Sequence, residues 1–239
     1  MIKIKDLSKS IRCNCAKKTL FHGFNLEIGK GEKVGLFSAN GTGKTTLMNI
    51  LAGIDKDFTG TVSNKGERIG YLYQDPQATL APWFTCEENI LLVRKYHHLD
   101  AEKGRALLKQ LSKALHLNFS LDDYPFTLSG GQRQIVTLLR GLILEPDVLL
   151  MDEPFSALDK EKRAIVVEFL KTRFTENMTV IMSSHREDEV TTLLGRAVVL
   201  EYQSATRIRA DVCLSTASSL QNFEYAVSES GFKRYAYDV

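Results

Sequence analysis

The sequence is short of several features that would each narrow its function. It has no run of about 18 apolar residues, so we expect no membrane-spanning helix. Its first residues, MIKIKDLSKS, are charged and contain no apolar core, which argues against a secretory signal peptide. Its formal net charge is only +2, so bulk charge gives no support for a nucleic-acid partner, and we predict none.

Cysteine is also scarce and is limited to Cys13, Cys15, Cys86 and Cys213. Without an export signal we expect reduced thiols in a cytosolic compartment rather than disulfides. Cys13 and Cys15 have the spacing of half a metal site, but no second pair of cysteines or histidines has ligand spacing. We therefore predict no thiolate-bound metal.

The composition is that of an ordinary globular chain, with 44% apolar and 25% charged residues among 239. Alternating segments at residues 2–4 and 20–28 predict antiparallel strands near the N-terminus. From about residue 75 to 145 the pattern is mostly helical, with a helix at 100–115 capped by Asp100 and another that begins near Gly130.

Strands and helices alternate in the last part of the chain. The patterns predict a buried strand at 148–151, a helix at 160–173, a strand at 179–183, a helix at 187–194 and a strand at 197–201. This alternation predicts βαβ units and an α/β fold with a parallel sheet. The tail, residues 203–239, is predicted as a helix at 218–230 packed on the core.

A glycine-rich stretch at residues 37–46, FSANGTGKTT, stands between a strand pattern and a helical pattern. This order of strand, loop and helix is the setting of a phosphate-binding P-loop. Gly41 and Gly43 can adopt backbone angles that turn N–H groups toward phosphate oxygens, and the helix N-terminus adds positive potential. The alternative is a tight glycine turn that binds nothing.

Three residues of this stretch carry specific expectations. We expect Lys44 to reach the β- and γ-phosphates of ATP and the Thr45 hydroxyl to hold Mg²⁺. Ser38 stands where the consensus has glycine, which alters the entry to the loop.

Two further motifs add groups that suit phosphate chemistry. Asp152 and Glu153 follow the buried strand at 148–151, where Asp152 is suited to hold Mg²⁺ and Glu153 to orient or deprotonate water. The stretch at residues 128–132, LSGGQ, opens a helix with a serine and two glycines, which is a second anion-binding helix N-terminus. Each motif alone could instead be a plain helix cap.

Taken in order, these motifs resemble those of the ATP-binding cassette (ABC) ATPases over about residues 2–200. The resemblance rests on the P-loop at 38–45, Gln74 after a strand, LSGGQ at 128–132, VLLMDEP at 148–154, SALD at 156–159 and His185 after a strand. It implies a P-loop NTPase (RecA-like) core with a parallel sheet, an N-terminal antiparallel β subdomain and an inserted helical subdomain. We predict one domain over residues 1–239, with the helical subdomain at about 76–145.

The resemblance also implies a mechanism in which two cassettes pair head to tail, with each ATP between one P-loop and the LSGGQ of the other copy. Glu153, His185 and Gln74 are then the catalytic residues, and Thr45, Gln74 and Asp152 lie near Mg²⁺. The residues expected to bind ATP are Ser38, Ala39, Asn40, Gly41, Thr42, Gly43, Lys44, Thr45, Thr46, Ser129, Gly130, Gly131, Gln132 and Asp159.

Two more positions depart from the family pattern. Ile11 stands where members usually stack adenine on an aromatic side chain, and Arg186 follows His185 where many members have Asp. We expect a weaker contact with the base and unchanged phosphate chemistry, which depends mainly on positioning and electrostatics.

The segment at residues 74–90 resembles the LLPWxTVxxNV segment of bacterial importers of nitrate, sulfonates, taurine and thiamine precursors. Trp83, the only tryptophan, would then lie where family members receive the coupling helix of a membrane subunit. The alternative is that Pro82 and Trp83 pack into the core.

We therefore predict the ATP-hydrolysing subunit of an importer, bound peripherally on the cytoplasmic face of the cell membrane. The expected partners are separate permease subunits, a second ATPase subunit (a homodimer) and a solute-binding protein. The alternatives are the same cassette in an exporter, a soluble ABC ATPase that acts on nucleic acid or ribosomes, and a degenerate cassette that does not hydrolyse ATP.

Overall fold

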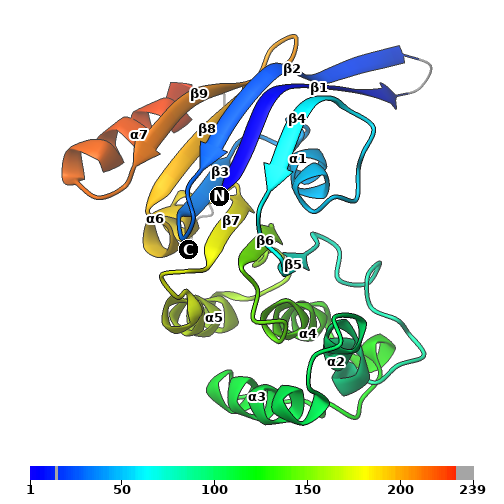
Figure 1. The fold of residues 1–239 in the computed structure, drawn as a ribbon. Helices are drawn as coiled ribbons and strands as arrows, with labels where there is room; N and C mark the ends of the chain where they lie inside the picture. Colours follow the sequence, from blue (N-terminus) through cyan, green and yellow to red (C-terminus); the bar gives the residue numbers. More distant parts are fainter. Residues whose placement is uncertain (14–15, 230–239) are drawn as a thin grey trace. The chain divides into compact units, whose positions relative to one another are not determined.

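The computed structural model describes residues 1–13 and 16–229, which form two compact units (Figure 1). The first unit comprises Met1–Lys65 and the chain from Ile181 onward, and the second comprises Gly66–Val180. Cys15 and the predicted end of the last helix at residue 230 lie outside the described residues. Within the described ranges, no helix combines the length and the apolar character that crossing a membrane requires.

The first unit begins with an antiparallel sheet. β1 (Ile2–Cys13) pairs with both β2 (Ala16–Ile28) and β4 (Thr59–Asn64). Apolar and polar residues alternate along the start of β1, so that Ile2 and Ile4 are buried on one face. The predicted N-terminal antiparallel sheet is confirmed, and its strands are longer than the sequence patterns indicate.

The remaining strands of this unit extend the sheet in the order β4-β1-β2-β9-β8-β3-β7. β3 (Lys33–Phe37) pairs in parallel with β8 (Arg196–Tyr202), which pairs antiparallel with β9 (Thr206–Cys213). The continuous apolar run of β3 is buried, as expected for a central strand. β7 (Thr179–Ser184) contains the boundary between the two units.

Strand β9 corrects the prediction for the tail, where the sequence pattern indicates only a helix. Charged and apolar residues alternate along this strand, and its apolar side chains are only half-buried. This alternation is typical of a strand, but it is short and was missed beside the helical pattern that follows it. The helix that follows, α7 (Ala217–Glu229), is confirmed within the described residues.

Three helices complete the first unit. α1 (Lys44–Leu51) follows β3, α6 (Glu187–Leu193) packs on β3, and α7 packs on β8 and β9 (Figure 1). α6 can approach because Gly35 has no side chain: a Cβ there would lie 2.7 Å from Val190 Cγ1. The ring of Phe223 anchors α7 edge-on against Phe37, with 5.5 Å between the ring centroids.

The second unit is mostly helical. Its strands β5 (Ile69–Leu72) and β6 (Val148–Asp152) are parallel neighbours. α4 (Gly130–Leu142) packs on β5 and against α2 (Cys86–Tyr96) and α3 (Ala101–Ala114), as Figure 1 shows. A 3₁₀ turn, η1 (Pro125–Thr127), precedes α4, and α5 (Lys160–Arg173) follows β6.

Most element predictions in this unit are confirmed. α5 has the predicted bounds, α4 begins at Gly130, and α3 is capped by Asp100, which accepts a hydrogen bond from Lys103 N at 3.0 Å. The α/β fold class is confirmed. The organisation as one domain with an inserted helical subdomain at residues 76–145 stays a prediction.

Candidate functional site

The loop between β3 and α1, residues 38–43, has the backbone of an anion-binding turn. Gly41 and Gly43 have φ of 80° and 97°, angles that favour glycine, and no heavy atom lies within 4 Å of an added Cβ at Gly41. Ala39, Asn40 and Gly41 are exposed, so a ligand can reach their backbone. Gly43 is the N-cap of α1, and Leu47 N donates to its carbonyl at 2.8 Å. We call residues 38–46 the phosphate loop.

Ser38 fits this loop without the glycine of the consensus. It is buried, and its φ is not positive. Its hydroxyl contacts Thr42 Oγ1 at 2.5 Å. The Lys44 ammonium donates to Ser38 O at 2.8 Å, to Ser38 Oγ at 3.2 Å and to Ala39 O at 3.3 Å. The serine therefore contributes to the internal bonding of the loop and places Lys44 inside it.

Two distant segments of the first unit also hold the phosphate loop. The Thr206 hydroxyl, at the start of β9, donates to Thr42 O at 2.5 Å. Lys18, in β2, donates to Gly41 O at 3.1 Å. The sequence analysis missed both residues, because they lie far from the loop in the chain and belong to no motif.

Two carboxylates stand at the end of β6 in the second unit, Asp152 as its last residue and Glu153 directly after it. Asp152 is 1% exposed. Burial of Tyr71 raises the pKa of its phenol well above the usual range, and the negative charge of the nearby Asp152 raises it further. Glu153 is buried and has a φ of 50°, a left-handed conformation that is strained for glutamate. The end of β6 therefore carries two buried carboxylates in succession.

Gln74 follows the neighbouring strand of the same unit. β5 and β6 are parallel, with Leu72 opposite Met151, so Gln74 and Asp152 leave the sheet at the same edge. The Gln74 side chain is exposed. The structure therefore brings together the predicted metal ligands Gln74 and Asp152 and the predicted base Glu153.

The LSGGQ stretch forms the N-terminus of α4 through a capping box. Ser129 Oγ accepts a hydrogen bond from Gln132 N at 3.3 Å, and Gln132 Oε1 accepts one from Ser129 N at 2.8 Å. The Ser129 hydroxyl can still donate its hydrogen to an anion. A Cβ at Gly131 would lie 3.0 Å from Ala157 O, so this glycine allows the segment 156–159 to approach the helix start.

Asp159 has a structural position at the start of α5. Its carboxylate accepts a hydrogen bond from Lys162 N at 2.9 Å, and this backbone contact lowers the pKa of the carboxyl. It also pairs with the Lys162 ammonium at 3.1 Å. The structure thus gives Asp159 a capping role, and its predicted contact with nucleotide stays a prediction.

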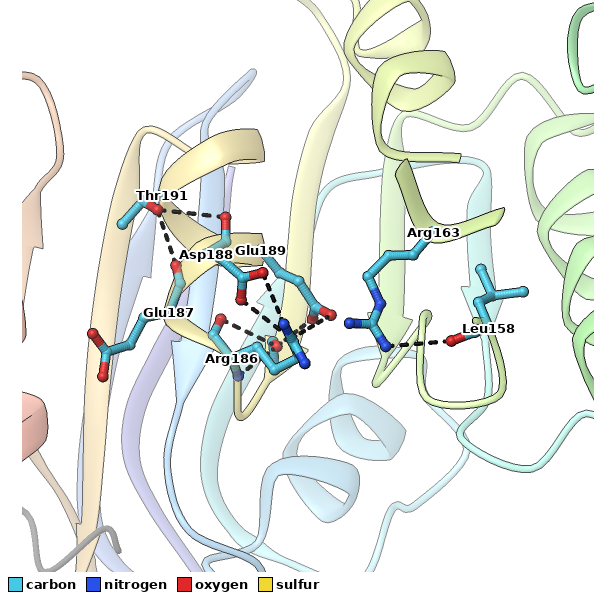
Figure 2. A network of polar contacts seen from close by, with 8 residues as sticks. Leu158, Arg163, Arg186, Glu187, Asp188, Glu189 and Thr191 are labelled. Atoms are coloured by element: carbon cyan, nitrogen blue, oxygen red, sulfur yellow. Dashed lines mark hydrogen bonds and ion pairs between the residues drawn. The ribbon is translucent and has the colours of Figure 1, made fainter. Parts of the chain in front are cut away.

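His185 follows β7 in the first unit and is held by its neighbours in the chain. Ser184 Oγ donates to Glu189 Oε2 at 2.6 Å and accepts a hydrogen bond from Arg186 N at 3.0 Å. Figure 2 shows the Arg186 guanidinium turned toward Asp188, which it meets at 3.0 Å, and toward Glu189, at 3.5 Å. Arg186 therefore anchors the turn around His185 to the start of α6.

The loop after Gln74 is pinned at two points. Arg140, in α4, donates to Thr79 O at 2.7 Å and to Thr79 Oγ1 at 2.9 Å. The buried Asn89 side chain accepts from Ala81 N at 2.8 Å and donates to the carbonyls of Ala81, Phe84 and Thr85 at 3.0–3.1 Å. The sequence analysis missed both pinning residues, because neither their helical positions nor their spacing distinguishes them from ordinary helix residues.

This pinned loop presents Trp83 to solvent with 72% of its side chain exposed. The alternative in which Trp83 packs into the core is therefore wrong. Phe84, whose ring lies 6.3 Å from that of Trp83, lines an adjoining hollow of about 580 Å³. Apolar side chains, several basic ones and one carboxylate line it: Phe84, Glu88, Leu91, Leu92, Arg94, Lys95, His98, Leu99, Ala101 and Arg105.

The donor groups suit a nucleoside triphosphate and Mg²⁺. The open backbone at Gly41, the buried Lys44 and the helix N-terminus suit phosphate oxygens. Thr45 carries an exposed hydroxyl in the first turn of α1, and Asp152 carries a buried carboxylate. Oxygen donors of these two kinds are the ligands that Mg²⁺ prefers.

Comparison with known proteins gives a consistent result. A family model described as ABC transporter matches residues 21–156. The aliphatic sulfonates import ATP-binding protein SsuB 1 of Pseudomonas savastanoi pv. phaseolicola is 35% identical over 192 residues, which cover 80% of this chain and 78% of that protein. The Nod factor export ATP-binding protein I of Paraburkholderia xenovorans is 32% identical over 202 residues, 80% of this chain and 66% of that protein.

A solved structure confirms the fold. The dimeric structure of a post-hydrolysis state of the ATP-binding cassette MJ0796 bound to ADP and Pi matches with a TM-score of 0.80 at 24% identity, over 90% of this chain and all of that one. The P-loop NTPase fold predicted from the motifs is therefore correct. Together with the family match and the sulfonate-protein relative, the phosphate loop and the LSGGQ helix show that the chain belongs to the ABC transporter family, as an ATP-binding subunit that couples ATP hydrolysis to transport.

Proposed function

We propose that this subunit energises separate membrane subunits of an importer and binds them through Trp83 and the adjoining hollow, on the cytoplasmic face of the cell membrane. The observation that carries the proposal is the exposure of the only tryptophan on a loop that the hydrogen bonds of the buried Asn89 side chain hold in place. An exposed aromatic side chain on a rigid loop is a common anchor of protein interfaces. We call Trp83 and the residues that line the hollow the docking surface.

The docking surface suits a helix with apolar side chains. Leu91, Leu92 and Leu99 line the hollow, which offers space for such side chains, and Lys95 and Arg105 stand among the lining residues. An amphipathic helix that enters a groove with its apolar face is a recurrent mode of recognition. A short helix on the cytoplasmic side of a membrane subunit is a partner of this kind.

For the chemical step we assign the phosphates to the phosphate loop and the water to Glu153. Lys44 and the loop N–H groups hold the β- and γ-phosphates, and the Glu153 carboxylate orients the attacking water and accepts its proton. Thr45 and Asp152 would hold Mg²⁺, which would supply positive charge against the phosphate oxygens. The strained backbone at Glu153 favours this role, because strain of this kind collects at functional sites.

A second copy of the chain completes the proposal. Ser129 and Gly131 of each copy would contact the γ-phosphate held by the other, because a helix N-terminus with a free hydroxyl hydrogen suits an anion. His185 and Gln74 would sense the γ-phosphate and the bound water, and Asp159 would lie near His185 of the facing copy. ATP binding would close the dimer, and hydrolysis would reopen it.

Import is supported by the segment around Trp83, which resembles that of sulfonate and nitrate importers, and by the relative named for sulfonate import. An importer of this kind works with a solute-binding protein. The competing proposal is export, and the relative named for Nod factor export favours it.

The docking proposal is tested by affinity purification of the tagged chain from membranes. Trp83→Ala should reduce the recovered membrane subunits about tenfold, since interface anchors of this size dominate binding. The matched control is Tyr96→Ala, which removes another exposed aromatic side chain of the same unit that does not line the hollow. Equal recovery with Trp83→Ala and with the unaltered chain would overturn the docking proposal.

The direction of transport is tested with the recovered complex in proteoliposomes. An importer should show faster ATP hydrolysis when its solute-binding protein is present on the face opposite the ATPase subunit. Stimulation by a solute on the ATPase face alone would favour the exporter.

A further inference from the structure

Tyr202 lies beside the phosphate loop, and the function proposed above gives it no role. It is the last residue of β8, in which Val199 lies opposite Phe37, the last residue of β3. β8 therefore extends beyond the level at which β3 ends and the phosphate loop begins. Tyr202 pairs with Thr206, whose hydroxyl donates to Thr42 O, so the turn that carries Tyr202 is fixed to that loop.

Lys18 joins Tyr202 to the same loop from the other side. Its Nζ donates to Gly41 O at 3.1 Å and lies 4.3 Å from the centroid of the Tyr202 ring. Both side chains are half-buried. The ammonium covers one face of the ring, and because it is a flexible, strongly hydrated group it can leave that face more easily than a packed core side chain could.

We propose that Tyr202 is the surface on which the purine base of the bound nucleotide stacks, and that Lys18 leaves the ring when the base arrives and contacts the phosphate chain. Ile11 lies opposite Lys18 in the β1–β2 pairing, so the residue that replaces the expected aromatic borders the same cluster. Stacking on an aromatic ring is an interaction that isoleucine cannot supply. The inference rests on the proposed use of the phosphate loop for ATP.

A second position for the base is a hollow of about 800 Å³ in the same unit. Ile11 and Phe58 are among its lining residues. None of the described residues that line it belongs to the phosphate loop. Phe21, which lines it and lies 3.0 Å from an added Cβ at Gly43, is fully buried, whereas the half-buried Lys18 donates to Gly41 O and lies over the Tyr202 ring. A base joined to phosphates in the loop is therefore better placed at Tyr202.

The test is calorimetric titration of the whole chain with ATP and, separately, with inorganic tripolyphosphate, which has no base. Tyr202→Ala should raise the Kd for ATP about tenfold, the loss expected for one stacked base, and should leave the Kd for tripolyphosphate unchanged. Tyr202→Phe keeps the ring and should retain the Kd for ATP. Tyr225→Ala, which removes an exposed tyrosine of α7, is the matched control and should change neither value.

Two results would overturn the inference while leaving ATP binding intact. One is an unchanged Kd for ATP in Tyr202→Ala, and a weaker Kd in Phe58→Ala would then place the base in the hollow. The other is an equal loss of affinity for ATP and for tripolyphosphate in Tyr202→Ala. If the unaltered chain bound neither ATP nor tripolyphosphate, the proposed function would fail as well, so the two failures are distinct.

Discussion

Replacement of Asn89 by alanine should loosen the loop that presents Trp83. The Asn89 residue is 1% exposed, and its side chain makes four polar contacts with the backbone of residues 81–85 at 2.8–3.1 Å: Oδ1 accepts from one amide, and three carbonyls share the two hydrogens of Nδ2. Alanine removes all four and leaves the amide of Ala81 without its acceptor. Because a net hydrogen bond contributes about 1 kcal/mol and a buried unpaired donor costs more, we expect a loss of about 3 kcal/mol in the free energy of unfolding.

The single tryptophan makes this prediction directly measurable. Trp83 emission should report unfolding at a midpoint that is roughly 6–12 °C lower in Asn89→Ala, given a domain of this size. Its fluorescence anisotropy at 20 °C should also fall, because the loop becomes mobile. Asn118→Ala, which removes an exposed asparagine with one long contact of 3.5 Å, should change neither quantity. A midpoint within about 2 °C of the unaltered chain, with unchanged anisotropy, would refute the view that Asn89 holds the loop.

Three further predictions concern single positions. Ser38→Gly should lower the free energy of unfolding of the nucleotide-free chain by about 1 kcal/mol, as measured by chemical denaturation. The hydroxyl contacts with Thr42 and Lys44 are lost, and glycine gives the unfolded chain more conformational freedom. Gly60→Ala should lower the free energy of unfolding by more than about 2 kcal/mol, because the added Cβ would lie 2.4 Å from a backbone carbonyl oxygen. The Cβ of Gly23→Ala meets no atom within 4 Å, so this control should lower it less in the same assay. Burial raises the pKa of the Cys86 thiol to about 11, so the contribution of the neutral thiol to the free energy of unfolding is complete below pH 9 and is lost as the pH rises through 11. Peptide mapping after alkylation at pH 8 should find Cys213 modified and Cys86 protected.

The parts of the fold that depend on local pattern could be predicted from the sequence. The bounds of α5 and the start of α4 follow from caps and apolar spacing, and β6 follows from a continuous apolar run. β9 was missed although its residues alternate, because the alternation is short, its apolar side chains are only half-buried, and the strand is stabilised by pairing with β8 and β2 and by the packing of α7.

The site shows the same division between local and distant information. The motifs predict the phosphate loop, because its geometry depends on glycines that are adjacent in the chain. Thr206, Lys18 and Tyr202 reach that loop from other strands, so no local pattern connects them with it. The sequence also left the position of Trp83 open, since a Pro-Trp pair suits both a core loop and an exposed one. Its exposure follows from the hydrogen bonds of Asn89, which only the folded chain reveals.

The central claim is that two copies of the chain close on ATP and that Glu153 then drives its hydrolysis. Light scattering during size-exclusion chromatography of Glu153→Gln tests it most directly, because this change removes the base and keeps the groups that bind phosphate. With ATP and Mg²⁺ we predict a particle of twice the chain mass of 26.9 kDa, and without ATP a single chain. A single chain at every protein concentration, with ATP bound, would contradict the claim.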